Sequence, residues 1–210
     1  MFRGNSLEQI LLSVPALLIA ITFHEFAHGY VAYRLGDPTA KNYGRLTLNP
    51  VKHLDPLGAI TLLLVGFGWA KPVPVDPAYF RNPKKGMALV GLAGPAANII
   101  IAFLTLVLAA IFEINLFRGT GYLAGMMIYT IFLNIGLAVF NLIPIPPLDG
   151  SKIFSAFLPP KIYFGIMRYE RYAHVILLLL LFTGILTPFL VFLQRIVLNA
   201  LILIVNVLPL

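Results

Sequence analysis

The sequence contains no cysteine and little charge, and each of these absences excludes a class of protein. Without cysteine the chain can form neither a disulfide framework nor a thiolate metal site. Only 11% of its 210 residues are charged, whereas soluble globular domains carry about 25%. Since 60% of the residues are hydrophobic and the mean hydropathy is +0.91, a disordered chain or an ordinary soluble domain is excluded. The composition predicts an all-α membrane protein in a lipid bilayer.

Four apolar stretches are long enough to cross a bilayer as helices, at about residues 7–35, 87–112, 122–143 and 174–208. The last stretch fits either one long tilted helix or a hairpin of two helices broken near Pro188 and Arg195. A shorter glycine-containing segment, residues 57–75, favours a re-entrant or interfacial hairpin between the first two confident spans. The sequence thus predicts a single domain, residues 1–210, built as a polytopic helical bundle of about four to six transmembrane segments.

Basic residues are distributed unequally between the two sides of these spans. Twelve of the fifteen fall in the loops on one side: Arg34, Lys41, Arg45, Lys52, Lys71, Arg81, Lys84, Lys85, Lys152, Lys161, Arg168 and Arg171. The other side holds Arg3, Arg118 and, if the last stretch is a hairpin, Arg195. Basic loops favour the cytoplasmic side, so we expect a multi-pass protein of the cell membrane with its N-terminus outside. The positive charge then reports orientation, and no nucleic acid partner is expected.

The first span contains the sequence His24-Glu25-Phe26-Ala27-His28. Two histidines at positions i and i+4 share one helical face, so both imidazoles can reach one metal ion. Glu25 can reach the open side of such an ion and take a proton from water. Ionisable side chains inside an apolar helix are costly, which favours a metal partner. The alternative is a pair of polar histidines bonded to a neighbouring helix.

A catalytic zinc site has three protein ligands and one open position. Without cysteine, the candidates for the third ligand are His53, Asp55, Asp76, Glu113, Asp149 and His174. Asp149 follows an apolar run, residues 141–148, in which three prolines prevent a continuous helix. Such a segment must be buried or line a cavity, which favours Asp149. Asp55, on the same predicted side, remains an alternative.

Together, these two motifs resemble those of the site-2 protease family, which are intramembrane zinc metalloproteases. The second motif reads Asn141-x-x-Pro-x-Pro-x-Leu-Asp149-Gly150 and follows the first by about 120 residues. The likeness also includes Gly-Pro-Ala-Ala-Asn at residues 94–98 and the stretch from 45 to 58. It is closest to the compact bacterial members that lack PDZ and CBS domains.

The resemblance implies one Zn²⁺ held by His24, His28 and Asp149, with Glu25 activating the hydrolytic water. It implies that Asn141 polarises the scissile carbonyl or stabilises its oxyanion. Asn98 would help to bind the unwound backbone of the substrate, although a buried asparagine can equally join two helices.

The expected activity is hydrolysis of peptide bonds in transmembrane proteins or peptides, near the cytoplasmic side of the bilayer. Residues 57–75 could offer an extended edge to an unwound substrate. The alternative function is a zinc-binding membrane protein without proteolysis, such as a metal transporter or a pseudoprotease. The sequence names no particular substrate, and it leaves open whether the protein is a monomer or a homo-oligomer.

Overall fold

Four long apolar helices dominate the computed structural model, which describes residues 7–58, 61, 69–116, 121–159, 162 and 170–209. They are α1 (Leu7–Arg34), α4 (Pro83–Ile111), α5 (Tyr122–Asn141) and α9 (Thr187–Val207). Each has the length and the apolar composition needed to cross a membrane. The predicted class, an all-α polytopic membrane protein, is confirmed.

The ends of the spans follow from local sequence chemistry. Helix α4 begins at Pro83, four residues before the predicted start, because the Asn82 side chain accepts a hydrogen bond from the Lys85 N–H. Proline at the first helical position loses no hydrogen bond, so Pro83 supports this start. Helix α5 ends at Asn141, two residues before the predicted end and three before Pro144.

The last apolar stretch forms two helices, which settles the choice between one helix and two. Helix α8 (Glu170–Phe182) has 13 residues, and a turn in which Gly184 has a φ of 71° separates it from α9. Pro188 lies in the first turn of α9, where the missing N–H costs nothing, and Arg195 lies inside that helix. The described part of α8 spans about 20 Å, less than the roughly 30 Å of a bilayer core.

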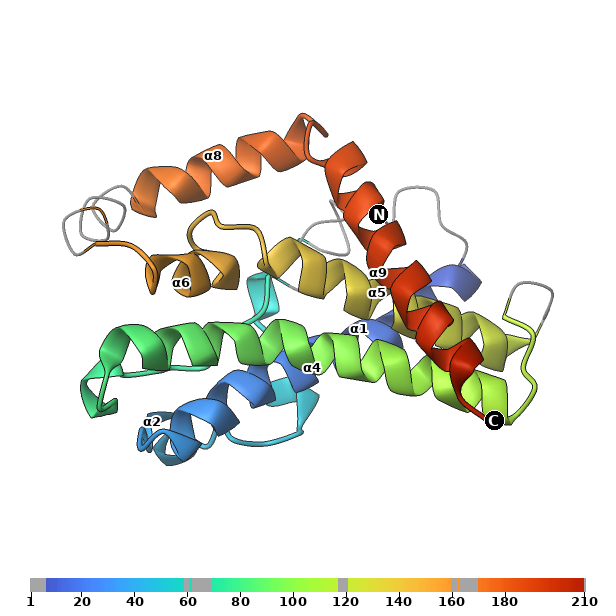
Figure 1. Ribbon diagram of the computed structural model, residues 1–210, viewed down its shortest axis with the longest axis horizontal. Helices are drawn as coiled ribbons and strands as arrows, with labels where there is room; N and C mark the ends of the chain where they lie inside the picture. Colours follow the sequence, from blue (N-terminus) through green and yellow to red (C-terminus); the bar gives the residue numbers. More distant parts are fainter. Residues whose placement is uncertain are drawn as a thin grey trace.

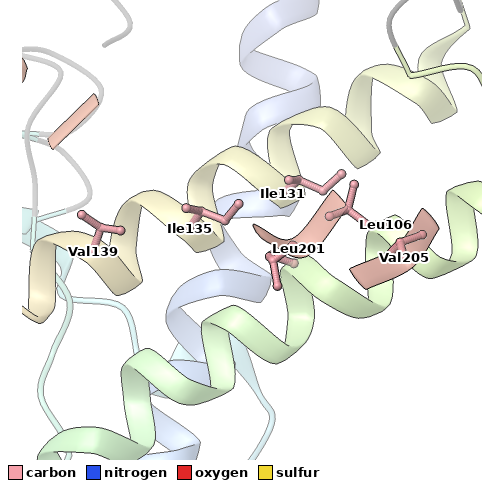
Figure 2. Close-up of a cluster of buried hydrophobic side chains, with 7 residues drawn as sticks. Leu106, Ile131, Ile135, Val139, Leu201 and Val205 are labelled. Carbon is pink, nitrogen blue, oxygen red and sulfur yellow. The ribbon is translucent and has the colours of Figure 1, made fainter. Parts of the chain in front are cut away.

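Helices α1, α4 and α5 pack against one another and form the centre of the molecule, while α9 crosses over α4 and α5 (Figure 1). Figure 2 shows the apolar contact that holds α9 in place, made by Leu106, Ile131, Ile135, Val139, Leu201 and Val205. In lipid, helices associate through such close packing because the solvent itself is apolar. Most of the remaining α9 surface is exposed, as suits a helix that faces lipid.

Short elements collect at the end of the bundle where α1 ends and α4 begins. They are α2 (Thr39–Asn42), η1 (Pro50–Lys52), η2 (Pro77–Tyr79) and, beside α4, α6 (Asp149–Ser155). Leu54 and Ala70 form an antiparallel bridge at the base of the predicted hairpin. The central part of that hairpin, residues 59–60 and 62–68, lies outside the described residues. After the bridge the chain returns to α1, where the Val73 side chain lies against Gly29.

Candidate metal centre

Three buried side chains from two distant parts of the chain converge on one point. His24 Nε2 lies 3.0 Å from His28 Nε2. Asp149 Oδ2 lies 3.1 Å from the first of these nitrogens and 3.0 Å from the second. The three residues are 4–7% exposed. The structure therefore brings the predicted ligand set together, and these side chains could hold a single metal ion.

The hydrogen bonds behind the imidazoles determine which ring atoms face one another. His28 Nδ1 donates to the Val90 carbonyl at 2.7 Å, and His24 Nδ1 donates to Asn98 Oδ1 at 2.6 Å. A neutral imidazole carries one N–H, so both Nε2 atoms present lone pairs. These lone pairs face each other and a carboxylate oxygen. The three electron-rich atoms repel one another unless a cation lies between them. Bonds that fix the tautomer in this way are typical of metal-ligating histidines.

The spacing of these donors fits a zinc ion. Zinc binds imidazole nitrogen and carboxylate oxygen at about 2.0–2.2 Å, so neighbouring ligands of a tetrahedral ion lie about 3.3–3.5 Å apart. The observed separations of 3.0–3.1 Å are only slightly shorter. Two nitrogens and one oxygen leave one tetrahedral position for water or substrate, as catalytic zinc sites require.

Local geometry explains why Asp149 reaches the histidines. His24 and His28 are one helical turn apart on α1, whereas Asp149 is the first residue of α6. The chain between α5 and α6 doubles back tightly, so that Gly150 lies against the carbonyl groups of Leu142 and Ile143. A carboxylate in the first turn of a helix is also favourably placed relative to the helix dipole.

Two glycines of α4 allow the neighbouring elements to approach closely. A Cβ atom at Gly94 would collide with His28 Nε2 and lie 2.6 Å from the Cε1 atoms of His24 and His28. A Cβ atom at Gly91 would lie 3.0 Å from the Asp149 carbonyl oxygen. The helix surface at these positions therefore leaves room for the imidazoles on one side and for α6 on the other.

Asp149 divides its two carboxylate oxygens between different partners. Oδ2 faces the imidazoles, and Oδ1 accepts a hydrogen bond from Lys152 Nζ at 2.8 Å. Burial raises the pKa of the Asp149 carboxyl, whereas the positive charge of Lys152 lowers it. The ammonium group therefore favours the ionised carboxylate that a metal ligand requires.

Glu25 belongs to the same helix but contacts a different part of the chain. It is buried, and its Oε2 accepts a hydrogen bond from the Val73 N–H at 2.8 Å. The segment that supplies this N–H is itself fixed, because Lys71 bonds through its carbonyl to the Arg45 guanidinium and through its N–H to the His53 carbonyl. The predicted role of Glu25 in activating water stays a prediction.

The two predicted asparagines occupy different positions relative to the ligands. Asn141 ends α5 and donates from Nδ2 to the Leu137 carbonyl at 3.0 Å. Asn98 is fully buried behind His24 and donates from Nδ2 to the Ala20 carbonyl and to Asn134 Oδ1. Their roles towards substrate remain predictions, and the contacts of Asn98 support a further role in orienting the His24 ring.

The other candidates for the third ligand make contacts elsewhere. His53 is buried and bonds through Nε2 to the Thr47 carbonyl. Asp55 and Asp76 accept hydrogen bonds from the N–H groups of Gly58 and Ala78, respectively. Glu113 follows the far end of α4, and the His174 side chain lies outside the described residues.

Sequence reasoning missed three features of the site: Asn134, Lys152 and the Val73 N–H. A signal existed for Asn134, since a lone asparagine inside an apolar span needs a partner. Lys152 follows Asp149 by three residues, which is a favourable spacing for an ion pair on one helical face. No sequence pattern marks the Val73 N–H, because backbone groups are present in every residue.

Comparison with known proteins identifies relatives that are named as zinc metalloproteases. A family model described as peptidase family M50 matches residues 115–186. A Bacillus subtilis protein named "Putative zinc metalloprotease YwhC" is 44% identical over 175 residues, which cover 81% of this chain and 80% of the relative. Rip2 of Mycolicibacterium smegmatis, with the same kind of name, is 30% identical over 82% of this chain and 67% of its own length. No solved structure matches the chain significantly.

The fold and the buried histidine–aspartate cluster define a membrane-embedded metalloprotease. The chain belongs to peptidase family M50, the site-2 protease family, and is a multi-pass membrane protein. The resemblance inferred from the two sequence motifs is thereby confirmed.

Proposed function

We propose that this protein hydrolyses peptide bonds of transmembrane proteins or peptides near the cytoplasmic side of the bilayer, with one Zn²⁺ held by His24, His28 and Asp149. The observation that carries the proposal is the convergence of three lone-pair donors at 3.0–3.1 Å inside an apolar helical bundle. The names of the relatives support zinc as the metal. When bound, zinc would polarise the scissile carbonyl and lower the pKa of water to about 7.

Glu25 acts as the general base in this proposal. Its Oε2 is held by the Val73 N–H, which leaves Oε1 to take a proton from the attacking water. The same oxygen then delivers this proton to the leaving amine, so Glu25 returns to its starting state. Holding one oxygen fixes the direction of the other, and such positioning of a catalytic group lowers the barrier.

Asn141 and Asn98 interact with substrate in this proposal. Asn141 is half-buried at the end of α5, eight residues before Asp149, and its amide can turn towards a substrate carbonyl. To donate there, Nδ2 exchanges its bond to the Leu137 carbonyl for one to the substrate oxygen. Asn98 reaches substrate only if its side chain releases at least one of its partners, because both of its polar atoms are bonded.

The location of the site supports a substrate in or beside the membrane. His24 lies ten residues before the end of α1, or about 15 Å along the helix at 1.5 Å per residue. The same end of the bundle carries Arg34, Lys84 and Lys85, which the positive-inside rule assigns to the cytoplasm. Water would therefore enter from that side, and the substrate would present an unwound segment at this depth.

A Glu25→Gln variant tests the proposed activity. The substitution keeps the size of the side chain but removes its proton acceptor. We therefore expect unchanged zinc content and loss of cleavage. Membrane proteomics of cells with wild-type or variant protein would reveal fragments that form only with the wild type. Equal fragment patterns in both strains would contradict proteolysis and favour a zinc-binding protein without it.

A further inference from the structure

The carboxylate of Asp149 is held by two different kinds of partner, one on each oxygen. Oδ2 lies 3.0–3.1 Å from both imidazole Nε2 atoms, while Oδ1 accepts a hydrogen bond from Lys152 Nζ at 2.8 Å. A carboxylate without such a partner can rotate about its Cβ–Cγ bond and place both oxygens on a metal ion. The ammonium group of Lys152 opposes this rotation, because it would break a charge-assisted hydrogen bond.

Lys152 is held in place by the way α6 packs on α4. The Lys152 side chain is 37% exposed and that of Asp149 is 6% exposed, so the lysine approaches the carboxylate from the solvent side of the cluster. A Cβ atom at Gly91 of α4 would lie 3.2 Å from Lys152 Cβ and 3.0 Å from the Asp149 carbonyl oxygen. This close packing fixes the first turn of α6 and with it the relative position of the two side chains.

We infer that Lys152 is a positioning residue that restricts Asp149 to one oxygen towards the metal and so keeps a coordination position open for water or substrate. The inference rests on the proposed zinc site and adds a residue that neither the family motif nor the ligand geometry requires. A catalytic zinc ion needs three protein ligands and one open position. A second oxygen from Asp149 would compete for that position.

The test uses the full-length protein in detergent with Co²⁺ in place of Zn²⁺, because the intensity of the visible cobalt absorption falls as the coordination number rises. In Lys152→Met we expect zinc to remain bound, the cobalt absorption to weaken, and kcat to fall about 10- to 100-fold with little change in KM. Lys152→Arg keeps a charged donor and should restore the wild-type spectrum. Lys85→Met removes a lysine from an exposed position on α4 and should leave spectrum and activity unchanged.

Two results would overturn the inference. A wild-type cobalt spectrum in Lys152→Met would show that Asp149 keeps its coordination without the lysine. Loss of zinc from the folded variant would show that Lys152 only stabilises the site as a whole. If the methionine variant elutes as an aggregate on size exclusion, Lys152→Ala, which also lacks a donor, takes its place with the same expected spectrum. Failure of the proposed function is distinguishable, since the wild type itself would then either bind neither metal or bind zinc without cleaving peptide bonds.

Discussion

The Oδ1 atom of Asn98 accepts a hydrogen bond from His24 Nδ1 at 2.6 Å, so a fully buried amide of α4 orients a candidate ligand of α1. The amide itself cannot be inverted, because its Nδ2 donates to the Ala20 carbonyl at 2.9 Å and to Asn134 Oδ1 at 2.8 Å. Asn134 is oriented in turn by donating to the Thr130 carbonyl. A polar network across α1, α4 and α5 thus fixes which nitrogen of His24 is available to a metal.

Replacing Asn98 with leucine should weaken zinc binding by about 10- to 100-fold, the usual cost of losing the partner of a metal-ligating histidine. The His24 ring would lose the acceptor that fixes its tautomer, and its Nδ1–H would be buried without a partner. Competition with a chelator of known affinity measures the change. Asn199→Leu makes the same substitution at an exposed position of α9 and should leave zinc affinity unchanged. Equal affinities in both variants would contradict the orienting role of Asn98.

Replacing Asn134 with leucine should act more weakly and mainly on stability. The Asn98 amide would lose one of its two acceptors but keep the Ala20 carbonyl, so the direction of its Oδ1 is retained. Hydrogen bonds between membrane helices contribute about 0.6 kcal/mol on average and up to about 1.7 kcal/mol. Unfolding in mixed detergent micelles should show that the free energy of unfolding falls by an amount in this range, while the zinc affinity is nearly unchanged. A loss of zinc affinity as large as that of Asn98→Leu would contradict the smaller role of Asn134.

The ligand pair could be predicted from sequence because helical periodicity alone places His24 and His28 on one face. Asp149 required a second signal, the prolines that end regular helix before it, and even then Asp55 remained a rival. The spacing of Lys152 and Asp149 could have indicated their ion pair. The contact between Asn134 and Asn98 could not be predicted, because it depends on how closely α4 approaches α5. The close approach of α4 to α1 and α6 likewise depends on residues without side chains, Gly94 and Gly91, whose effect is visible only in three dimensions.

The long helices were predictable for a similar reason, since a bilayer requires about 20 apolar residues for each crossing. The final stretch was ambiguous because most of residues 174–208 are apolar and only a few polar residues interrupt them. Its break falls at residues 183–186, where Gly184 adopts a positive φ, rather than at Arg195. A positive φ is readily adopted by glycine, but the sequence alone does not reveal which glycine adopts it.

Replacing Gly94 with alanine should disrupt the metal centre. The new Cβ atom would meet the His28 ring and lie 2.6 Å from His24 Cε1, which is closer than such atoms can approach, so the imidazoles must move. We expect loss of most bound zinc, measured by metal analysis of the purified protein. Gly121→Ala is the matched control, since a Cβ atom there has no neighbour within 4 Å. Full zinc content in Gly94→Ala would show that the site tolerates the displacement.

Replacing Val73 with proline should impair catalysis without affecting the metal. Proline lacks the N–H that binds Glu25 Oε2, and the neighbouring residues Pro72 and Pro74 already require an extended chain at this point. Without this bond the Glu25 carboxylate is free to rotate, so we expect kcat to fall by about 10- to 100-fold. Zinc content should stay at the wild-type level, because no ligand contacts Val73 directly.

Val73→Ala separates the lost hydrogen bond from the lost side chain. The alanine variant keeps the N–H but removes the methyl groups that pack against Gly29, so it should retain most of the activity. A pattern in which the proline variant is slow and the alanine variant is nearly normal, with equal zinc in both, assigns the effect to the backbone donor. Equal losses in both variants would instead assign it to packing of residues 71–75 on α1, because the side chain is the feature that both variants lack.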